Sequence, residues 1–206
     1  MTDKIELFYA PTSPYVRKVM ASAIELGLAE RIVKLPSAAH PLQRDARIAA
    51  FNPLAQVPAA RLADGTLLFD SRVICEYLDD LGGGTLFPRG PERWQILTEQ
   101  ALGDGLLNAA LLARYESTCR SDEIRSQPWI EGQMTKIAAA LDQMERTVAV
   151  IGSRISIGSL TIACALGYLD LRFASYHWRS SRPALTQWFA AISRRPSLQE
   201  TFPADL

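Results

Sequence analysis

The chain has 206 residues, with 22 Lys and Arg against 22 Asp and Glu, so its formal net charge is zero. A balanced charge gives no electrostatic reason to expect nucleic acid or an anionic membrane as the main partner. The N-terminal residues contain no uninterrupted apolar stretch of the signal-peptide type. The longest apolar stretch near the C-terminus, residues 160–169, is about half the roughly 20 residues that span a bilayer. We therefore expect a soluble, cytoplasmic protein.

The first part of the sequence alternates between strand-like and helix-like segments. Residues 5–9 alternate in the manner of a strand, and residues 14–26 carry apolar side chains at the helical period. A second short strand is expected at residues 31–35. Residues 41–50 form a weaker helical segment, which ends before Pro53 because a residue that precedes proline avoids helical geometry.

A hairpin and another helix follow. Residues 59–62 and 66–69 flank an Ala-Asp-Gly turn, which predicts an antiparallel pair of strands. Residues 71–81 have a helical apolar period that ends at three consecutive glycines. The predicted order is βαβ, α, ββ, α.

The rest of the chain is predicted to be helical. Residues 83–90 have the composition of a linker. Helices are expected at residues 91–115, 130–148, 157–175 and 184–194. An α/β unit followed by a run of helices indicates two domains, which we place at residues 1–82 and 91–206.

Cysteines and histidines are few and scattered. The 3 cysteines are Cys75, Cys119 and Cys164, and the 2 histidines are His40 and His177. None of them has the spacing of a zinc site or of a Cys-X-X-Cys motif. We expect reduced thiols that act as small core residues, and neither a bound metal nor a cysteine nucleophile.

Ser13 lies where the first predicted strand meets the first predicted helix. Pro14 follows it, and proline is favoured at the first helical position because its missing N–H would have no intrahelical partner there. Ser13 is therefore interpreted first as a helix N-cap, a position where serine is strongly preferred. The same geometry directs exposed N–H groups and the positive helix end toward the space beside Ser13, which favours an anion such as a thiolate.

Two other short motifs allow both a structural and a functional interpretation. The Val57-Pro58 pair is either an edge-strand feature or a cis proline that exposes the backbone of Val57 to an extended ligand. Asp70 and Ser71 either cap the next helix or offer a carboxylate and a hydroxyl to an ammonium and a carboxylate. Each motif by itself is a weak signal.

In combination, the motifs at residues 13–15, 57–58 and 70–71 resemble the glutathione S-transferase family. The resemblance covers the whole chain, is most specific over residues 52–79, and is closest to bacterial cytosolic members with serine before Pro-Tyr or Pro-Phe. It implies an α/β thioredoxin-like N-terminal domain followed by an all-α C-terminal domain.

The resemblance also implies roles for individual residues. Ser13 would donate a hydrogen bond to the sulfur of glutathione and stabilise its thiolate. Val57 would pair its backbone with the cysteinyl part of the tripeptide, and Asp70 and Ser71 would hold the γ-glutamyl end. Gln56 would approach the glycyl carboxylate, where many relatives have lysine. Because serine cannot form a mixed disulfide, conjugation or peroxide reduction is favoured over thiol transfer.

The resemblance places the electrophile pocket between the domains, with Tyr9 and the loop to Ser13 on one side. On the first helix of the second domain, Leu107, Leu111 and Tyr115 share a face at i, i+4 and i+8 spacing. For the leucines, an ordinary core between helices is at least as good an interpretation. Tyr115 is the better candidate, because its hydroxyl can meet a polar substrate or a leaving group.

Residues 156–159 resemble the capping box of the family's second domain. Ser159 occupies the position where aspartate is usual. We expect Ser156 and Ser159 to cap the helix through their hydroxyls, with a weaker response to the helix dipole. We also expect Ser159→Asp to raise the melting temperature.

The implied activity is that of a glutathione transferase. Glutathione would be the co-substrate, no metal would be needed, and the bound thiolate would attack a small apolar electrophile. The alternatives are glutathione-dependent peroxide reduction, which uses the same thiolate, and a weakly catalytic module that binds glutathione or another protein. Relatives are usually homodimers, and we expect a homodimer here.

Overall fold

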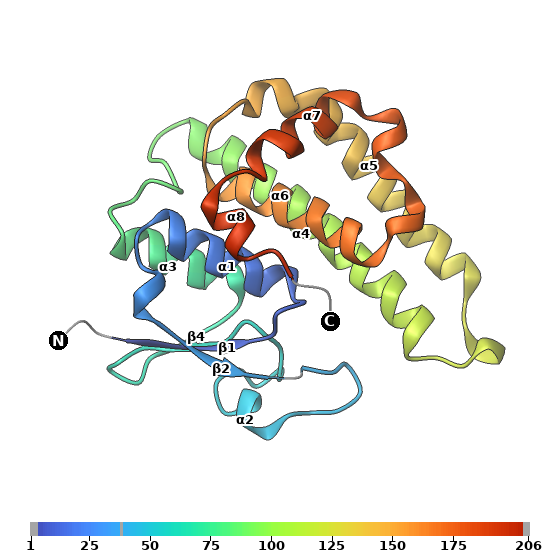
Figure 1. Ribbon diagram of the computed structural model, residues 1–206. Helices are drawn as coiled ribbons and strands as arrows, with labels where there is room; N and C mark the ends of the chain where they lie inside the picture. Colours follow the sequence, from blue (N-terminus) through green and yellow to red (C-terminus); the bar gives the residue numbers. More distant parts are fainter. Residues whose placement is uncertain (1–3, 38, 204–206) are drawn as a thin grey trace. The chain divides into compact units, whose positions relative to one another are not determined.

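The computed structural model describes residues 4–37 and 39–203, which Figure 1 shows as a ribbon. Contacts between residues divide the chain into two compact units. The first unit extends to Arg93 and takes in the C-terminal segment from Pro196 onward, and the second is Trp94–Arg195.

A 4-stranded mixed sheet underlies the first unit, in the order β2-β1-β3-β4. Its strands are β1 (Ile5–Tyr9), β2 (Ile32–Pro36), β3 (Ala60–Arg61) and β4 (Leu67–Leu68). β1 pairs in parallel with β2 and antiparallel with β3, and β3 and β4 form an antiparallel hairpin. The predicted parallel pair and hairpin are confirmed, although the strands of the hairpin are shorter than expected.

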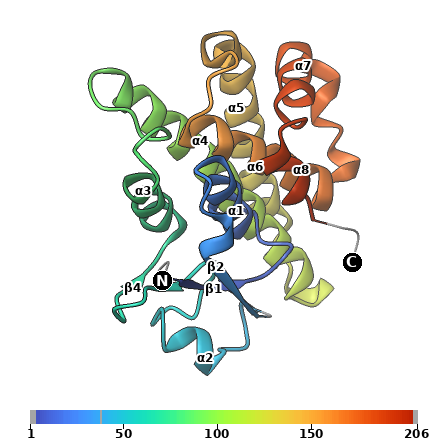
Figure 2. The same ribbon diagram turned by 60° about the vertical axis from the view of Figure 1, so that its left-hand side comes forward.

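Helices cover both faces of this sheet, as Figure 2 shows. They are α1 (Pro14–Glu25) and α3 (Ser71–Leu81) on one face and the short α2 (Ala46–Ala49) on the other. Successive side chains of a strand point to opposite faces. Leu7 of β1 is accordingly fully buried, while Phe8 packs against Phe51 next to α2, with ring centroids 4.7 Å apart.

The helix predicted at residues 41–50 is much shorter than expected, because only α2 forms within it. Asp45 caps α2 by accepting the N–H of Arg47 at 2.8 Å. Within this segment the core buries the side chain of Ile48, whereas the side chain of Leu42 is 70% exposed. The residues before Asp45 therefore have no apolar face to bury, and they remain a loop.

The sequence did not predict a short last helix, α8 (Pro196–Glu200), which packs on α1. The guanidinium of Arg17 donates to the carbonyl of Leu198 at 3.0 Å, and the hydroxyl of Ser197 donates to the carboxylate of Glu25. These contacts join the C-terminal segment to the first unit, although we expected residues 91–206 to form one helical domain.

The segment at residues 83–90 is anchored despite its linker composition. Leu86 and Phe87 are buried. Their amide N–H groups donate to the carboxylate of Asp79, at 2.6 and 3.2 Å. The buried carboxylate thereby holds the chain against the end of α3.

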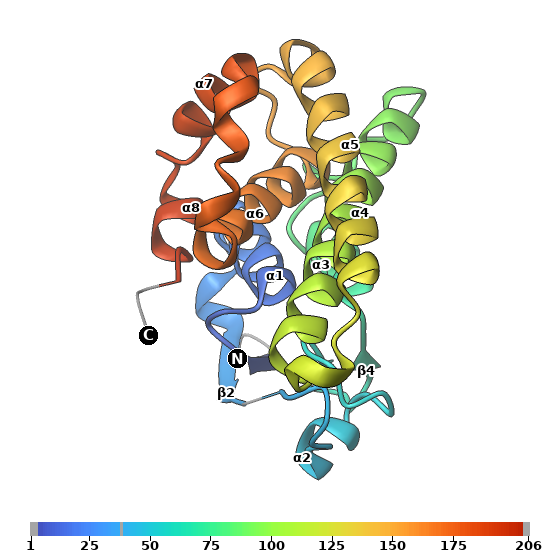
Figure 3. The ribbon, with the colours of Figure 1, turned by 90° about the vertical axis from the view of Figure 1, so that its right-hand side faces the viewer.

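The second unit is helical, and Figure 3 shows α4 and α5 lying side by side. Its main helices in the described part of the chain are α4 (Glu92–Thr118), α5 (Gln127–Ile151), α6 (Ile157–Arg172) and α7 (Pro183–Ile192). All four predicted helices are therefore present. α4 and α5 are antiparallel, and the carboxylate of Glu116 accepts the N–H of Ser126 at 2.9 Å between them.

The predicted capping box is present at the start of α6. The Ser156 hydroxyl accepts the N–H of Ser159 at 3.3 Å, and the Ser159 hydroxyl accepts the N–H of Ser156 at 2.9 Å. The Ser159 hydroxyl also donates to the carbonyl of Ser156 at 3.0 Å. Both side chains are buried, so the two serines satisfy each other.

α6 is buried from Ile157 to Leu169. No single helix among the described residues is long and apolar enough to cross a membrane. α6 meets that test only together with the segment Ala174–Ser181, across a bend of 99°.

Candidate active site

Ser13 ends the loop after β1 and caps α1. Its N–H donates to the carbonyl of Ala10 at 3.0 Å, and its hydroxyl oxygen accepts the N–H of Val16 at 3.3 Å. Pro14 occupies the first turn of the helix, so the predicted N-cap is confirmed. The side chain is half-buried, and no described residue accepts its hydroxyl proton. Ser13 therefore keeps a hydrogen-bond donor for a ligand.

The peptide bond between Val57 and Pro58 is cis, which confirms the predicted cis proline. The N–H of Phe8 donates to the carbonyl of Ala59 at 2.9 Å, so the chain pairs with β1 directly after the proline. Among the described residues, neither the N–H nor the carbonyl of Val57 has a backbone partner. Val57 therefore offers a donor and an acceptor to an added extended chain.

The pairing of β1 and β3 brings Val57 and the loop that leads to Ser13 to the same end of the sheet. In this pair Leu7 lies opposite Ala60. Antiparallel strands run in opposite directions, so the residues that lead from Val57 into β3 lie at the end of β1 from which the chain continues to Ser13. Ala10 begins the loop that ends at Ser13, and the two motifs therefore meet at one end of the sheet.

The β3–β4 hairpin brings the third motif to the same end. Ala60 lies opposite Leu68 in this pair, so the chain leaves β4 toward Ser71 at the end of the sheet where Val57 leads into β3. The start of α3 consequently lies at the same end of the sheet as Val57. All three motifs come together within the first unit.

Asp70 caps α3 as Ser13 caps α1. Its Oδ1 accepts the N–H of Arg72 at 2.9 Å, and its Oδ2 accepts from the guanidinium of Arg72 at 3.1 Å. Partial burial raises the pKa of Asp70, but the hydrogen bonds of Arg72 and the charges of Arg72 and Lys18 outweigh this effect, and the pKa lies below its usual value. Asp70 is thus an ionised carboxylate on the surface, while Ser71 next to it is buried.

A buried asparagine that sequence reasoning missed shapes the loop before Val57. Asn52 accepts the N–H of Leu54 through Oδ1 and donates to the carbonyl of Gln56 through Nδ2, both at 3.0 Å. Between them Ala55 has a φ of 53°, in the left-handed region. The Gln56 side chain is exposed. The available signal was the Asn-Pro pair, because asparagine often bonds the backbone two residues later in a turn.

The four residues expected to contact the electrophile are divided between the two units. Tyr9, at the end of β1, is partly buried, with the Lys34 Nζ 4.8 Å from its ring centroid. On α4, Leu107 is fully buried, whereas Leu111 and Tyr115 are partly exposed. Full burial favours the core interpretation for Leu107, while Leu111 and Tyr115 keep surface that a ligand can reach.

The thiols are consistent with a structural role. Cys75 and Cys164 are fully buried and Cys119 is partly buried, and none of them forms a disulfide. Residues 4–37 and 39–203 contain no group of three His, Cys, Asp or Glu side chains that could hold a metal ion.

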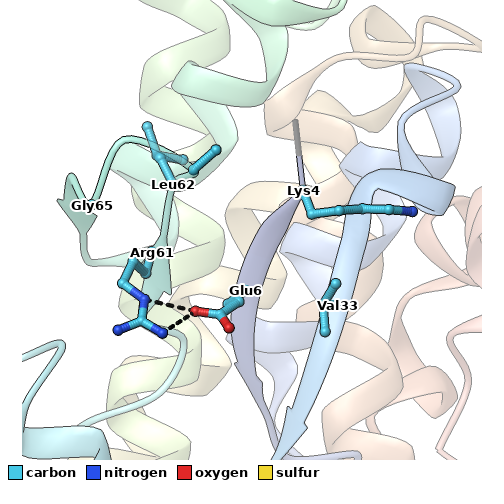
Figure 4. Close-up of a pocket in the computed structure, with 7 residues that line it drawn as sticks. Lys4, Glu6, Val33, Arg61, Leu62 and Gly65 are labelled. Carbon is cyan, nitrogen blue, oxygen red and sulfur yellow. Dashed lines mark hydrogen bonds and ion pairs between the residues drawn. The ribbon is translucent and has the colours of Figure 1, made fainter. Parts of the chain in front are cut away.

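A hollow of about 480 Å³ lies at the other end of β1, and Figure 4 shows the side chains that line it. Its lining includes Lys4, Glu6, Val33 and Arg61, and none of the predicted site residues contributes to it. The guanidinium of Arg61 donates to the carboxylate of Glu6 at 2.7 Å. Because these opposite charges already satisfy each other, nothing in the hollow points to a ligand.

Family models match both parts of the chain. The model described as the glutathione S-transferase N-terminal domain matches residues 12–81, and the model of the C-terminal domain matches residues 127–191. The uncharacterized GST-like protein YibF of Escherichia coli (strain K12) is 32% identical over 198 residues, which cover 93% of this chain and 95% of YibF.

Solved structures agree with this assignment. A glutathione transferase family member from Pseudomonas fluorescens Pf-5, with bound glutathione, is 42% identical with a TM-score of 0.96, covering 98% of this chain and 100% of that one. A structure from the same source with bound S-(propanoic acid)-glutathione is 41% identical with a TM-score of 0.91 and the same coverage. The chain therefore belongs to the glutathione S-transferase family, with a thioredoxin-like N-terminal fold and a helical C-terminal part.

Proposed function

We propose that the protein is a glutathione transferase that activates the thiol of glutathione at Ser13 for attack on a small apolar electrophile. The observation that carries the proposal is the position of the Ser13 hydroxyl at the start of α1, with its proton available to a ligand. The Pseudomonas fluorescens relative with bound glutathione supports glutathione as the co-substrate.

The donors at Ser13 are strong enough to favour a thiolate. A free thiol has a pKa of about 8.5, and lowering it by roughly two units makes the thiolate dominant at neutral pH at a cost of about 2.7 kcal/mol. A hydrogen bond to a charged group contributes about 1.5–3 kcal/mol. The N-terminal end of a helix adds about 0.3–1 kcal/mol. The two effects together match the required shift.

The neighbouring groups fit the rest of the tripeptide. The N–H and carbonyl of Val57 suit the peptide backbone of the cysteinyl residue, as in strand addition. The ionised Asp70 suits the ammonium of the γ-glutamyl residue, and Ser71 at the start of α3 suits its carboxylate. Gln56 offers a neutral donor to the glycyl carboxylate, a weaker contact than the lysine of many relatives would make.

The proposed reaction needs no covalent step on the enzyme. The thiol proton leaves to solvent, and the sulfur then donates its electron pair to the electrophilic carbon to form a C–S bond. In a substitution the leaving group departs with its bonding pair, and in an addition the displaced pair takes up a proton from water. Ser13 keeps its own proton and stabilises the sulfur charge by a hydrogen bond until the bond forms.

Glutathione titration tests this proposal directly. We would measure binding by calorimetry and the thiolate by its ultraviolet absorbance, in the wild type, in Ser13→Ala and in Ser126→Ala. Ser126 caps α5 by the same type of bond, so it is the matched control. We expect thiolate in the wild type and in the control, and its loss in Ser13→Ala. If glutathione binds but no Ser13-dependent thiolate appears, the proposed transferase activity is contradicted. If glutathione does not bind at all, it is not the co-substrate.

Two other functions remain to be separated from conjugation. Peroxide reduction uses the same thiolate, and a binding module keeps the glutathione site with slight catalysis. Assays with a panel of electrophiles and with organic hydroperoxides, both in the presence of glutathione, distinguish the three.

Ser13→Cys tests whether residue 13 faces the sulfur of the ligand. A cysteine there can form a mixed disulfide with glutathione, so we expect this variant to gain thiol-transfer activity. A variant that gains none argues that Ser13 points away from the sulfur. We also propose that the protein is a cytoplasmic homodimer, as the family suggests, and a monomer in light scattering would remove the dimer.

A further inference from the structure

Arg17 is a buried cation that the proposed mechanism does not use. It lies on α1, and it is only 5% exposed. Its N–H donates to the carbonyl of Ser13 at 3.0 Å, so Arg17 follows Ser13 by one helical turn. Both residues belong to the first unit. Arg17 therefore brings a positive charge close to the proposed thiolate site without being one of the three motifs that form it.

The guanidinium of Arg17 is poorly satisfied for a buried charge. Its Nη2 donates to the carbonyl of Leu198 at 3.0 Å. Nε and Nη1 are buried and have no hydrogen-bond partner in the part of the chain that the structure describes. A buried N–H without an acceptor is costly, and a buried charge without a counter-ion is costlier. Stability alone therefore does not explain an arginine at this position.

No carboxylate among the described residues neutralises Arg17. On the two helices that hold it, Glu25 binds a hydroxyl of α8 two turns farther along α1, and Glu200 on α8 is exposed. Burial raises the pKa of Asp70, and Lys18, the other buried cation of α1, is one of the charges that outweigh this effect. Lys18 thus acts on an anion at the start of α3, and the charge of Arg17 remains for another anion.

The C-terminal segment helps to exclude water from Arg17. The ring centroid of Phe202 lies 5.1 Å from the guanidinium carbon of Arg17. α8 contacts α1 first at Glu25 and then at Arg17, so the segment runs back along α1 toward the start of that helix (Figure 1). An aromatic face in place of water stabilises a cation without screening its charge as water does.

Helix geometry limits how far the charge of Arg17 lies from a sulfur at Ser13. Residues four positions apart share one face of a helix, with Cβ atoms about 5–6 Å apart, and their side chains lean toward the N-terminal end. The guanidinium therefore lies roughly 10 Å or less from the Ser13 side chain. At an effective dielectric constant of about 20, a cation about 10 Å away lowers the pKa of a thiol by about one unit.

We propose that the buried charge of Arg17 stabilises the glutathione thiolate at a distance, in addition to the hydrogen bond of Ser13. Arg17 would not touch the sulfur, and the C-terminal segment would act only by holding the guanidinium in a place with little water. The inference rests on the proposed transferase function. It adds about one unit to the shift in thiol pKa that the Ser13 hydroxyl and the helix end supply.

Replacing Arg17 by methionine tests the inference, because the change removes the charge and leaves an apolar side chain in a buried place. The pKa of the bound glutathione thiol is read from the ultraviolet absorbance of the thiolate in a pH titration. We expect this pKa to rise by about one unit in Arg17→Met. Arg17→Lys keeps the charge and should restore most of the wild-type value. Arg146→Met, which removes an exposed arginine of α5, is the control and should leave the pKa unchanged.

A purely structural role of Arg17 predicts a different result. Exchanging a poorly paired buried charge for an apolar side chain is often neutral or stabilising, so we expect Arg17→Met to melt within a few degrees of the wild type. The difference in thiol pKa should persist in about 1 M salt, which screens exposed charges beyond about 3 Å. Phe202→Ala, which uncovers the guanidinium, should raise the thiol pKa by a smaller amount than Arg17→Met.

The inference and the proposed function fail in different ways. An unchanged thiol pKa in Arg17→Met overturns the inference, and so does an Arg17→Lys variant that behaves like Arg17→Met. Circular dichroism checks folding, and Arg17→Gln is a second neutral variant for which the same rise is expected. A wild type that does not bind glutathione, or whose thiol pKa is unchanged in Ser13→Ala, contradicts the proposed function instead.

Discussion

Ser13 and Ser156 begin helices through the same bond but differ in how far each hydroxyl is exposed. Each oxygen accepts the N–H of the residue three positions later, at 3.3 Å in both helices. Ser156 is buried, and Ser159 closes its capping box from the other side. No described residue accepts the hydroxyl proton of either serine, but Ser13 is only half-buried, so a ligand can reach its hydroxyl. Capping uses only a lone pair of the oxygen, so one local structure allows a purely structural serine and one that can serve a ligand.

Asp70 caps a third helix, and it does so with a carboxylate in place of a hydroxyl. It caps α3 through Oδ1, and its carboxylate also binds the exposed guanidinium of Arg72. A carboxylate has several lone-pair positions, so these two contacts leave room for another donor. The cap of α3 can therefore serve structure and ligand together, although a carboxylate has no proton to donate.

Removing the Ser13 hydroxyl should give the largest effect. If the thiolate loses roughly two units of pKa stabilisation, its fraction at pH 7 falls roughly 25-fold, and we expect kcat/KM for conjugation in Ser13→Ala to fall about tenfold or more. The loss of the cap should cost only about 1 kcal/mol of unfolding free energy. Conjugation rates measured from pH 6 to 10 should converge with the wild type at high pH, where the thiol ionises unaided. Full activity of the variant at pH 7 would place thiol activation elsewhere.

Replacing the charge at the start of α3 should have a smaller effect. We expect Asp70→Asn to weaken glutathione binding about fivefold, because an exposed ion pair contributes at most about 1 kcal/mol. The pKa of Asp70 is lowered in the folded protein, so the carboxylate is charged above about pH 4. The difference between the wild type and Asp70→Asn should be constant above that pH and disappear as the pH falls through the pKa of Asp70.

Calorimetric titrations at several pH values measure this difference. Asp122→Asn on the second unit removes another exposed carboxylate and is the control. A difference that grows as the pH falls contradicts the role of Asp70.

Local sequence signals predicted the elements that are bounded by proline, by glycine or by a helix-capping residue. α3 has the expected bounds, because Asp70 caps its start and glycines end it, and α1 begins at Pro14 as expected. α2 is shorter than the helix predicted at residues 41–50, because the first half of that segment has no apolar side chain that the core buries. α8 could not be predicted, because the contact of Arg17 with Leu198 joins residues far apart in the chain.

The site was predictable to the same extent. The three motifs could be recognised from the sequence, but the register of β1, β3 and β4 was needed to bring them to one end of the sheet. The sequence could not predict that the Ser13 hydroxyl lacks a protein acceptor or that Asn52 holds the turn before Val57, because both depend on how the chain folds.

Removing the hydroxyl of Ser156 should affect stability and leave the chemistry unchanged. We expect Ser156→Ala to lower the unfolding free energy by about 1–2 kcal/mol, because two N–H groups lose their reciprocal cap in a buried place. Glutathione affinity and conjugation below the melting range should equal those of the wild type. Urea unfolding and kinetics on the same sample measure both. A loss of activity as large as that of Ser13→Ala would show that the two caps are not functionally distinct.

Ser159 gives the smallest and most specific test of the comparison. Its hydroxyl accepts from the Ser156 N–H and donates to the Ser156 carbonyl, so Ser159→Ala should melt a few degrees below the wild type. An aspartate keeps the accepted bond and adds about 0.3–1 kcal/mol from the helix dipole, at the expense of the donated bond. We therefore still expect Ser159→Asp to melt about a degree or two above the wild type. A melting temperature below the wild type would show that the donated bond, or the burial of a charge, outweighs the dipole at this helix start.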